Sequence, residues 1–314
     1  MSLSTLPASP AAPSAQSGSQ AAISVIICTR NRASQLAQAL QAWTRVKYTA
    51  AWELIIVDNQ STDDTPSIIQ GYAASGLPLV TTVCTKVGLG AAREHGRRLA
   101  KAELLFFTDD DCYPAAEVLS AWELVARENA DAAFFGGRIL LWDESDAKVT
   151  VDYRETAQRY ETGRFIKAGS LQGANFCIRR EALERIGGVD DTIGAGTPFP
   201  FEDIDIFARA SASGYDGLFD PRPVVYHHHG RKQADLPTLL KAYDKGRGGY
   251  YMKCLFDSRM RRDALRHWYW AWLGSLRECW RSRTAAPLAS RWRELRAALH
   301  YMKARLAPGL PRRP

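Results

Sequence analysis

The segment Leu104-Leu105-Phe106-Phe107-Thr108-Asp109-Asp110-Asp111 takes an apolar run directly into three carboxylates. The apolar residues and the threonine predict a short buried strand, with the aspartates at its carboxyl end. Adjacent like charges repel one another, so the triplet is costly unless a positive group neutralises it. A hard divalent cation bound through oxygen ligands, itself carrying phosphates, would supply that charge. The alternative is an acidic loop that caps the next helix.

Strands and helices are predicted to alternate ahead of the triplet. The strands cover about 23–28, 52–57, 79–84 and 103–108, with helices at 33–43, 61–76 and 91–100 between them. This alternation predicts an α/β protein with a doubly wound parallel sheet, whose ligands bind beyond the carboxyl ends of the strands. The polar residues at those ends are expected to converge on one crevice: Thr29, Arg30, Asp58, Lys86, Asp109, Asp110 and Asp111.

The second half of the chain continues the pattern less regularly. Strands are predicted at 132–141, 173–178 and 224–226, and helices at 115–128, 180–186 and from Glu202 to about 213. Residues 194–198 are rich in Gly and Pro, and form either a loop that closes over a ligand or an ordinary flexible loop. Arg209 lies two turns after Glu202 and is expected to be its ion-pair partner.

Composition and charge narrow the class of protein. A hydrophobic content of 46% and a charged content of 24% are those of an ordinary globular protein. The six cysteines form no CxxC pair, which favours reduced thiols and a cytoplasmic location. No apolar run is long enough for a membrane-spanning helix, and residues 1–21 lack the features of a signal peptide and are predicted to be a disordered tail.

The net charge of +7 is unevenly distributed. Residues 231–314 hold 20 Lys and Arg against 6 Asp and Glu, whereas residues 1–230 hold 21 against 28, which predicts a boundary near residue 230. No nucleic-acid-binding motif accompanies the basic part, so nucleic acid is not the expected partner. Aromatic residues beside arginines in 265–274 suit either contact with a membrane surface or packing of helices onto the rest of the chain.

Six motifs occur in order between residues 22 and 230. They are Cys28-Thr29-Arg30-Asn31-Arg32, the segment 56–65, Gly88-Leu89-Gly90-Ala91-Ala92-Arg93, the triplet, Gly173-Ala174-Asn175 and Glu202-Asp203-Ile204-Asp205. In this order they resemble the family 2 glycosyltransferases, which have the GT-A fold. The resemblance implies a catalytic domain over 22–230 with a doubly wound, mostly parallel sheet and helices on both faces. A basic, aromatic-rich helical region would follow over 231–314.

The resemblance also implies a metal site. Asp111 would bind Mn²⁺ or Mg²⁺, and Asp109 or Asp110 would contact the metal or the ribose of a nucleotide-diphosphate sugar. A histidine after the last strand often completes such a site, and His227 is preferred over His229. Because side chains alternate along a strand, these two histidines are expected on one face and His228 on the other.

Further contacts with the nucleotide sugar follow from the same resemblance. Asp58 would bind the base or ribose in a pocket lined by Thr29 and Arg30. Either Lys86 or Arg93 would contact a phosphate or the base. Asn175 would approach the donor sugar. The alternatives are a turn-capping role for Asp58 and solvent-exposed positions for Lys86 and Arg93. Residues 246–251 could belong to the acceptor or diphosphate site.

Asp203 matches the family's general base, with Glu202 in support; two acids at a helix start are the alternative. The implied activity is metal-dependent, inverting transfer of a single sugar to a saccharide or lipid-linked hydroxyl. Such transfer serves polysaccharide, glycolipid or other cell-envelope glycan synthesis, in the cytoplasm or at the inner face of the membrane. A nucleotidyltransferase is disfavoured because no Gly-rich basic loop follows the first strand. An inert sugar- or lipid-binding scaffold is disfavoured by the intact Glu202-Asp203 pair.

Overall fold

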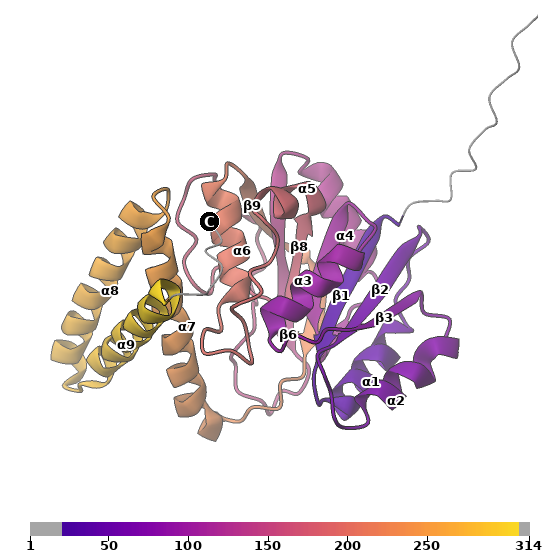
Figure 1. Cartoon of the computed structure of the whole chain (residues 1–314), viewed down its shortest axis with the longest axis horizontal. Helices are drawn as coiled ribbons and strands as arrows, with labels where there is room; N and C mark the ends of the chain where they lie inside the picture. Colours follow the sequence, from indigo (N-terminus) through magenta and orange to yellow (C-terminus); the bar gives the residue numbers. More distant parts are fainter. Residues whose placement is uncertain (1–20, 308–314) are drawn as a thin grey trace, which may run out of the picture.

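A computed structural model describes residues 21–307, in which one mixed β-sheet lies between two layers of helices (Figure 1). The predicted tail at 1–21 lies almost entirely outside the described residues. Among the described residues, the strand order is β3-β2-β1-β4-β8-β6-β9-β5, and β7 pairs with β9.

The first half of the sheet is parallel, as the alternation predicted. β1 (Ile23–Thr29) lies between β2 (Trp52–Asp58) and β4 (Leu104–Asp109), and β2 also pairs with β3 (Leu79–Val83). The strands are connected by α1 (Ala33–Trp43), α2 (Thr65–Gly71) with the short helix η1 (Tyr72–Ala74), and α3 (Leu89–Leu99). The register sets Thr29 beside Asp58 and Cys28 beside Asp109, so these strand ends form one edge.

The second half of the sheet changes direction after β4. β8 (Asn175–Arg179) is antiparallel to both β4 and β6 (Ala132–Leu141), and β6 is parallel to β9 (Asp216–His227). The three-residue strands β5 (Cys112–Pro114) and β7 (Gln158–Tyr160) pair antiparallel with β9. Strands of three residues are too short to show an alternation of apolar and polar residues, so the sequence did not predict β5 and β7. The first half of β9 was not predicted either, because Pro221 and Pro223 are unusual inside a strand.

Helices cover both faces of the sheet. One core cluster packs α1, α2 and α4 (Val118–Glu128) onto one face. The other packs α3, α5 (Arg180–Arg185) and α6 (Glu202–Ala212) onto the opposite face. Along β1, Val25 and Ile27 enter the first cluster and Ile26 the second, as strand alternation requires.

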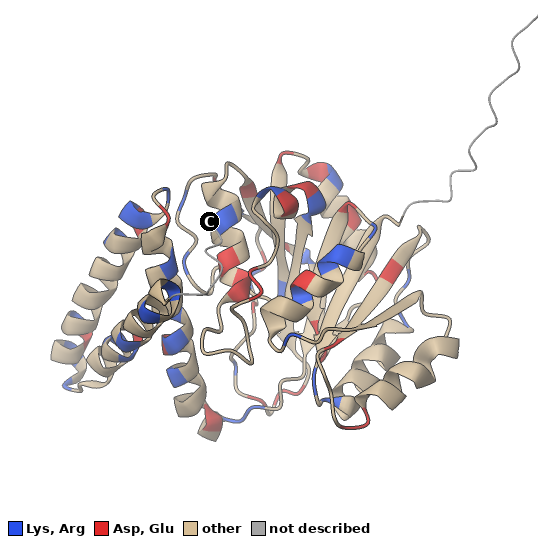
Figure 2. Cartoon of the chain, in the orientation of Figure 1, with Lys and Arg blue, Asp and Glu red and all other residues tan. Residues whose placement is uncertain are grey.

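Three long helices follow β9 and the short helix η2 (Gln233–Asp235): α7 (Leu236–Phe256), α8 (Arg261–Ser282) and α9 (Ala286–Leu306). α7 packs beside α6, and α8 and α9 lie outside it, away from the sheet (Figure 1). Basic residues recur along α7 and α9 and at the start of α8 (Figure 2). None of the described helices is both long and apolar enough to cross a bilayer.

The aromatic residues of α8 divide into two groups. Trp268 stacks on Tyr251 of α7 with ring centroids 5.4 Å apart, and Trp272 meets Trp292 of α9 edge to face. By contrast, several large apolar side chains of α8 are exposed: Leu265, Tyr269, Trp270, Leu276 and Trp280. Packing therefore accounts for only part of the aromatic content that the sequence placed in 265–274.

Candidate active site

Two adjoining pockets lie at the carboxyl ends of β1 and β4. The triplet pocket has a volume of about 380 Å³ and is lined by Asp109, Asp110 and Asp111 together with the chain after β1. The Asp203 pocket, of about 450 Å³, is lined by the start of α6, residues 168–169 and 171–174, and one side of α7. Six residues line both pockets and so mark their junction: Leu89, Asp109, Thr150, Ala195, His227 and Tyr243.

The charge of the triplet is balanced by basic groups of the chain itself. Arg32 at the start of α1 donates from Nε to Asp110 (2.8 Å) and from Nη2 to Asp111 (2.5 Å). The Thr29 hydroxyl donates to the second oxygen of Asp110 at 2.7 Å. Burial raises the pKa of Asp110 to about 7, against the lowering effects of Arg32 and Thr29. Arg32 thus occupies the position of a counter-ion.

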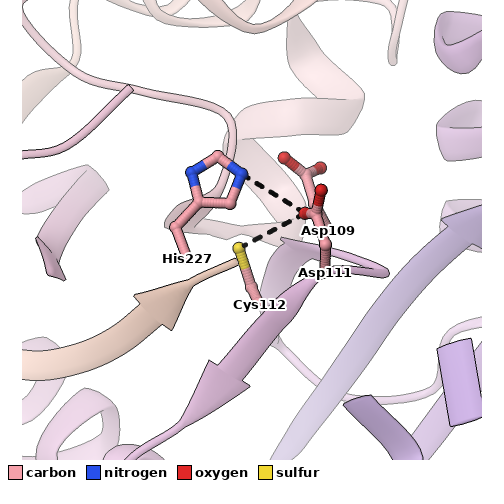
Figure 3. A group of neighbouring side chains, drawn as sticks. All are labelled: Asp109, Asp111, Cys112 and His227. Carbon is pink, nitrogen blue, oxygen red and sulfur yellow. Dashed lines mark hydrogen bonds and ion pairs between the residues drawn. The ribbon is translucent and has the colours of Figure 1, made fainter. Parts of the chain in front are cut away.

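A group of potential metal ligands lies at the junction of the pockets. One ligand atom from each of Asp109, Asp111, Cys112 and His227 falls within 4.8 Å of the others (Figure 3). Burial raises the pKa of the Cys112 thiol well above its ordinary value, so this residue stays protonated and is a poor ligand for a hard cation. The two carboxylates and the imidazole are donors that suit Mn²⁺, and the carboxylates also suit Mg²⁺.

His227 is oriented for this role by the backbone. Its Nδ1 faces the Thr150 carbonyl at 3.1 Å and so carries a hydrogen, while Nε2 lies 3.3 Å from Asp111 Oδ1. A ligating histidine commonly has its second nitrogen fixed in this way. Thr150 itself has a positive φ of 51°, a conformation that is strained for a β-branched residue. Burial lowers the pKa of His227, but Asp111 outweighs burial and the net pKa is raised.

Arg93 connects the triplet to the start of α6. Its buried guanidinium donates to Asp109, to Glu202 and to the Gly173 carbonyl, each at 3.0 Å. Glu202 was expected to pair with Arg209, and this expectation is wrong: Arg209 donates to Asp205 at 2.8 Å. The spacing of one helical turn between Asp205 and Arg209 favours that pair over the two-turn spacing to Glu202.

Asp203 is held by backbone donors rather than by a cation. Its Oδ2 accepts the Gly173 N–H at 2.8 Å, and its Oδ1 accepts the Ile204 N–H at 2.8 Å. A side chain at Gly173 would place its Cβ 3.0 Å from Asp203 Oδ2, so the glycine permits this close approach. The carboxylate is only half-buried and lines the Asp203 pocket.

The structure brings most of the predicted site residues to the two pockets. Thr29, Arg30, Asp109, Asp110, Asp111 and His227 line the triplet pocket, and Arg93, Glu202 and Asp203 line the other. Of the loop at 194–198, Ala195 and Gly196 reach the pockets. His229 lies beside His227, with ring centroids 5.2 Å apart, whereas His228 bonds the Tyr113 hydroxyl.

Three predicted donor-binding residues line neither pocket in the described part of the chain. Asp58 accepts the Ser61 N–H at 2.9 Å, as a turn aspartate does. Lys86 is half exposed and pairs with Asp191 at 3.0 Å. Asn175 is buried and donates to carbonyls of β6 and β9. Their contacts with a donor stay predictions.

The pockets also contain residues that the sequence did not single out. Thr150, Arg231 and Tyr243 belong to this group, and Asn59 lies beside the position of Asp58. No motif marks them, because tertiary packing alone brings them to the pockets. Of the segment 246–251, Gly246, Arg247 and Tyr250 line the Asp203 pocket, as one of the open interpretations anticipated.

The fold is shared with glycosyltransferases of the GT-A type. The mannosyltransferase PcManGT from Pyrobaculum calidifontis, solved with GDP-Man and Mn²⁺, has a TM-score of 0.60 at 20% identity, over 93% of this chain and 77% of that one. S. aureus TarS (residues 1–349), solved with UDP-GlcNAc, has a TM-score of 0.59 at 17% identity, over 77% of this chain and 69% of that one. The predicted fold class is confirmed.

The sequence model of Glycosyl transferase family 2 matches residues 24–187, more than half of the chain. The chain therefore belongs to glycosyl transferase family 2. It is 23% identical to the probable glycosyltransferase YdaM of Bacillus subtilis over 65% of this chain and 50% of that protein. It is 31% identical to a poly(ribitol-phosphate) beta-glucosyltransferase of Bacillus spizizenii over 25% of this chain and 13% of that protein. The chain thus spans half or less of the curated relatives that it matches.

Proposed function

We propose that the protein is a metal-dependent, inverting glycosyltransferase that moves a single sugar from a nucleotide-diphosphate donor to an acceptor hydroxyl. The observation that carries the proposal is the junction of the two pockets. It sets the potential metal ligands Asp109, Asp111 and His227 beside a pocket that holds the accessible carboxylate of Asp203. PcManGT with GDP-Man and Mn²⁺, and TarS with UDP-GlcNAc, support a nucleotide sugar as the donor.

Direct displacement requires a bound leaving group on one side of the anomeric carbon and an acceptor with a base on the other. Asp203 removes the proton of the acceptor hydroxyl as its oxygen bonds to the anomeric carbon. The bond from that carbon to the phosphate oxygen breaks, and the electron pair leaves with the nucleoside diphosphate. Asp109, Asp111 and His227 would hold Mn²⁺ or Mg²⁺, which would offset the charge of the diphosphate when bound.

The other site residues act through the donor or through Asp203. Thr29 and Arg30 line the triplet pocket and suit contacts with the nucleotide, the role that we also assign to Asp58, Lys86 and Asn175. The ion pairs of Arg93 with Asp109 and Glu202 fix the position of Asp109 relative to the start of α6. Burial raises the pKa of Glu202 to about 7 against the effect of Arg93, which fits a supporting group better than a second free base.

The proposal is tested by screening UDP- and GDP-sugars for thermal stabilisation with and without Mn²⁺. A donor that binds the folded state raises the melting temperature in proportion to its affinity. The stabilising donor is then incubated with acceptors, and the released nucleotide and the anomeric configuration of the product are determined. Release of pyrophosphate would identify a nucleotidyltransferase, retained configuration would reject inversion, and binding without turnover would identify an inert scaffold.

We further propose that residues 22–230 form the catalytic domain, that α7 adds residues to its pockets, and that α8 of the following helical region brings the domain to an anionic membrane surface. On α8 the exposed Leu265, Tyr269, Leu276 and Trp280 recur at helical spacing and therefore share one side. Arg266 and Arg277 adjoin that side. Rings at headgroup depth beside cations suit such a surface, and place the enzyme near a lipid-linked or cell-envelope acceptor at the inner face of the membrane.

A further inference from the structure

Tyr243, on α7, lies at the junction of the two pockets and carries an enclosed hydroxyl. It is one of the residues that line both, and it comes from the region that follows the family match. The hydroxyl oxygen is shielded from solvent and has no hydrogen-bond partner within residues 21–307. An enclosed hydroxyl without a partner is costly unless something that binds there completes it.

Two charged groups from opposite pockets act on this hydroxyl. Arg231 lines the triplet pocket, and Asp203 lines the other. Burial raises the pKa of Tyr243, Arg231 lowers it, Asp203 raises it, and the net pKa lies above the ordinary value. The phenol therefore keeps its proton at neutral pH and acts as a neutral hydrogen-bond donor between a cation and a carboxylate.

α7 is fixed in place by close backbone contacts on the side that carries Tyr243. A Cβ added at Gly246 would lie 2.5 Å from the Pro200 carbonyl oxygen, and one added at Gly249 would lie 2.5 Å from the Phe201 ring. Pro200 and Phe201 directly precede α6, on which Asp203 stands. The position of the Tyr243 hydroxyl relative to Asp203 is therefore set by packing rather than by a flexible loop.

We propose that the Tyr243 hydroxyl donates a hydrogen bond to the diphosphate of the donor at the oxygen that leaves the anomeric carbon. This inference rests on the proposed function. As the bond from the anomeric carbon to that oxygen breaks, the oxygen gains negative charge, and a donor already placed there stabilises the transition state more than the ground state. The proton of the acceptor goes to Asp203, and Tyr243 keeps its own proton throughout.

The test is Tyr243→Phe, with Tyr215→Phe as the matched control. The Tyr215 hydroxyl is likewise enclosed and without a partner in the described residues, but it lines neither pocket. Donor hydrolysis is measured with UDP-glucose, UDP-GlcNAc and GDP-mannose in the presence of Mn²⁺, together with the melting temperature and the affinity for UDP and GDP. These three readouts separate turnover, folding and binding of the leaving group.

Tyr243→Phe is expected to lower kcat by about a hundredfold to a thousandfold, as loss of one preorganised donor does. The melting temperature should not fall, the affinity for UDP and GDP should decrease because the leaving oxygen stays on their terminal phosphate, and Tyr215→Phe should hydrolyse the donor and bind the nucleotides as the wild type does. A kcat for Tyr243→Phe within twofold of the control would overturn the inference, as would an equal loss in both variants. Failure of the wild type to hydrolyse any nucleotide sugar would instead reject the proposed function.

Discussion

The triplet pocket and the Asp203 pocket share an edge but handle charge in opposite ways. In the triplet pocket the buried carboxylates of Asp110 and Asp111 are already paired with Arg32. In the Asp203 pocket the carboxylate of Asp203 accepts only backbone hydrogen bonds, and the Tyr243 hydroxyl has no partner in residues 21–307. The carboxylates of the first pocket thus have charged partners within the protein, whereas the second pocket presents groups without such partners to a bound molecule. On the proposed function, the first pocket holds the metal and the diphosphate and the second carries out the proton transfer.

The largest effect is expected at the free carboxylate. Asp203→Asn removes the proposed base without removing a cation's partner, and should lower transfer by as much as about 10⁴-fold, the upper range for a general base. Initial rates and melting temperatures should be compared with Glu181→Gln, an exposed acid in the first turn of α5. Near-normal turnover by Asp203→Asn would show that Asp203 is not the general base.

Loss of a metal ligand should come next. Asp111→Asn halves the pair of carboxylates at the cluster and should lower transfer by about 10³-fold, equivalent to about 4 kcal/mol of transition-state stabilisation. Calorimetric titration should show weakened Mn²⁺ binding, and chelation of the wild type should abolish transfer until Mn²⁺ is restored. Full activity of the wild type in the presence of a chelator would show that transfer does not require a metal ion bound by Asp109 and Asp111.

Arg93 tests whether the two pockets depend on one another. Arg93→Met leaves the buried Glu202 and the partly exposed Asp109 without their cation and should cost about 3 kcal/mol of unfolding free energy. The control is Arg98→Met on the same helix, which should cost less than about 1 kcal/mol because Arg98 is exposed and its partner Glu94 keeps the ion pair with Arg97. Urea unfolding measures both, and equal costs would mean that Arg93 is not a buried link.

Packing of the helices behind the Asp203 pocket should have a smaller effect. A Cβ at Gly248 would lie 2.1 Å from the Glu294 carbonyl oxygen of α9, so Gly248→Ala should destabilise the protein by about 1–3 kcal/mol. At Gly274 of α8 no atom lies within 4 Å of an added Cβ, and Gly274→Ala should be neutral or stabilising by up to about 1 kcal/mol. Thermal unfolding of the pair distinguishes close packing from helix propensity.

The smallest effect on the folded protein is expected at the surface of α8. Trp280 is 88% exposed, so Trp280→Ala should change neither donor hydrolysis nor the melting temperature. Sedimentation with anionic vesicles should nevertheless decrease, because the ring would no longer enter the headgroup region. Unchanged sedimentation, or equal binding to neutral vesicles, would count against a membrane role for this face.

The sequence could predict one pocket much better than the other, for physical reasons. The triplet follows a continuous buried strand, and parallel neighbours with the same pattern place their ends together, so local sequence carried that information. Thr150 and Tyr243 lie at the junction only because distant elements pack there, and no local pattern marks them. The partner of Arg209 was predicted wrongly because two acids, Glu202 and Asp205, precede it on the same helix. Only the structure shows that Glu202 is bound by Arg93, so that Arg209 pairs with Asp205.

The contacts of Arg93 limit which residues of the two pockets can change independently. A substitution at Asp109 or Glu202 alone would leave the buried guanidinium with one carboxylate partner instead of two, so either change is better tolerated together with a compensating one. The same cavity is also bordered by uncharged residues: Ala168, Gly169, Leu171, Gln172 and Tyr243. If the proposed function holds, single mutations on that side can alter the fit of an acceptor, while the residues that Arg93 joins change at a cost to one another.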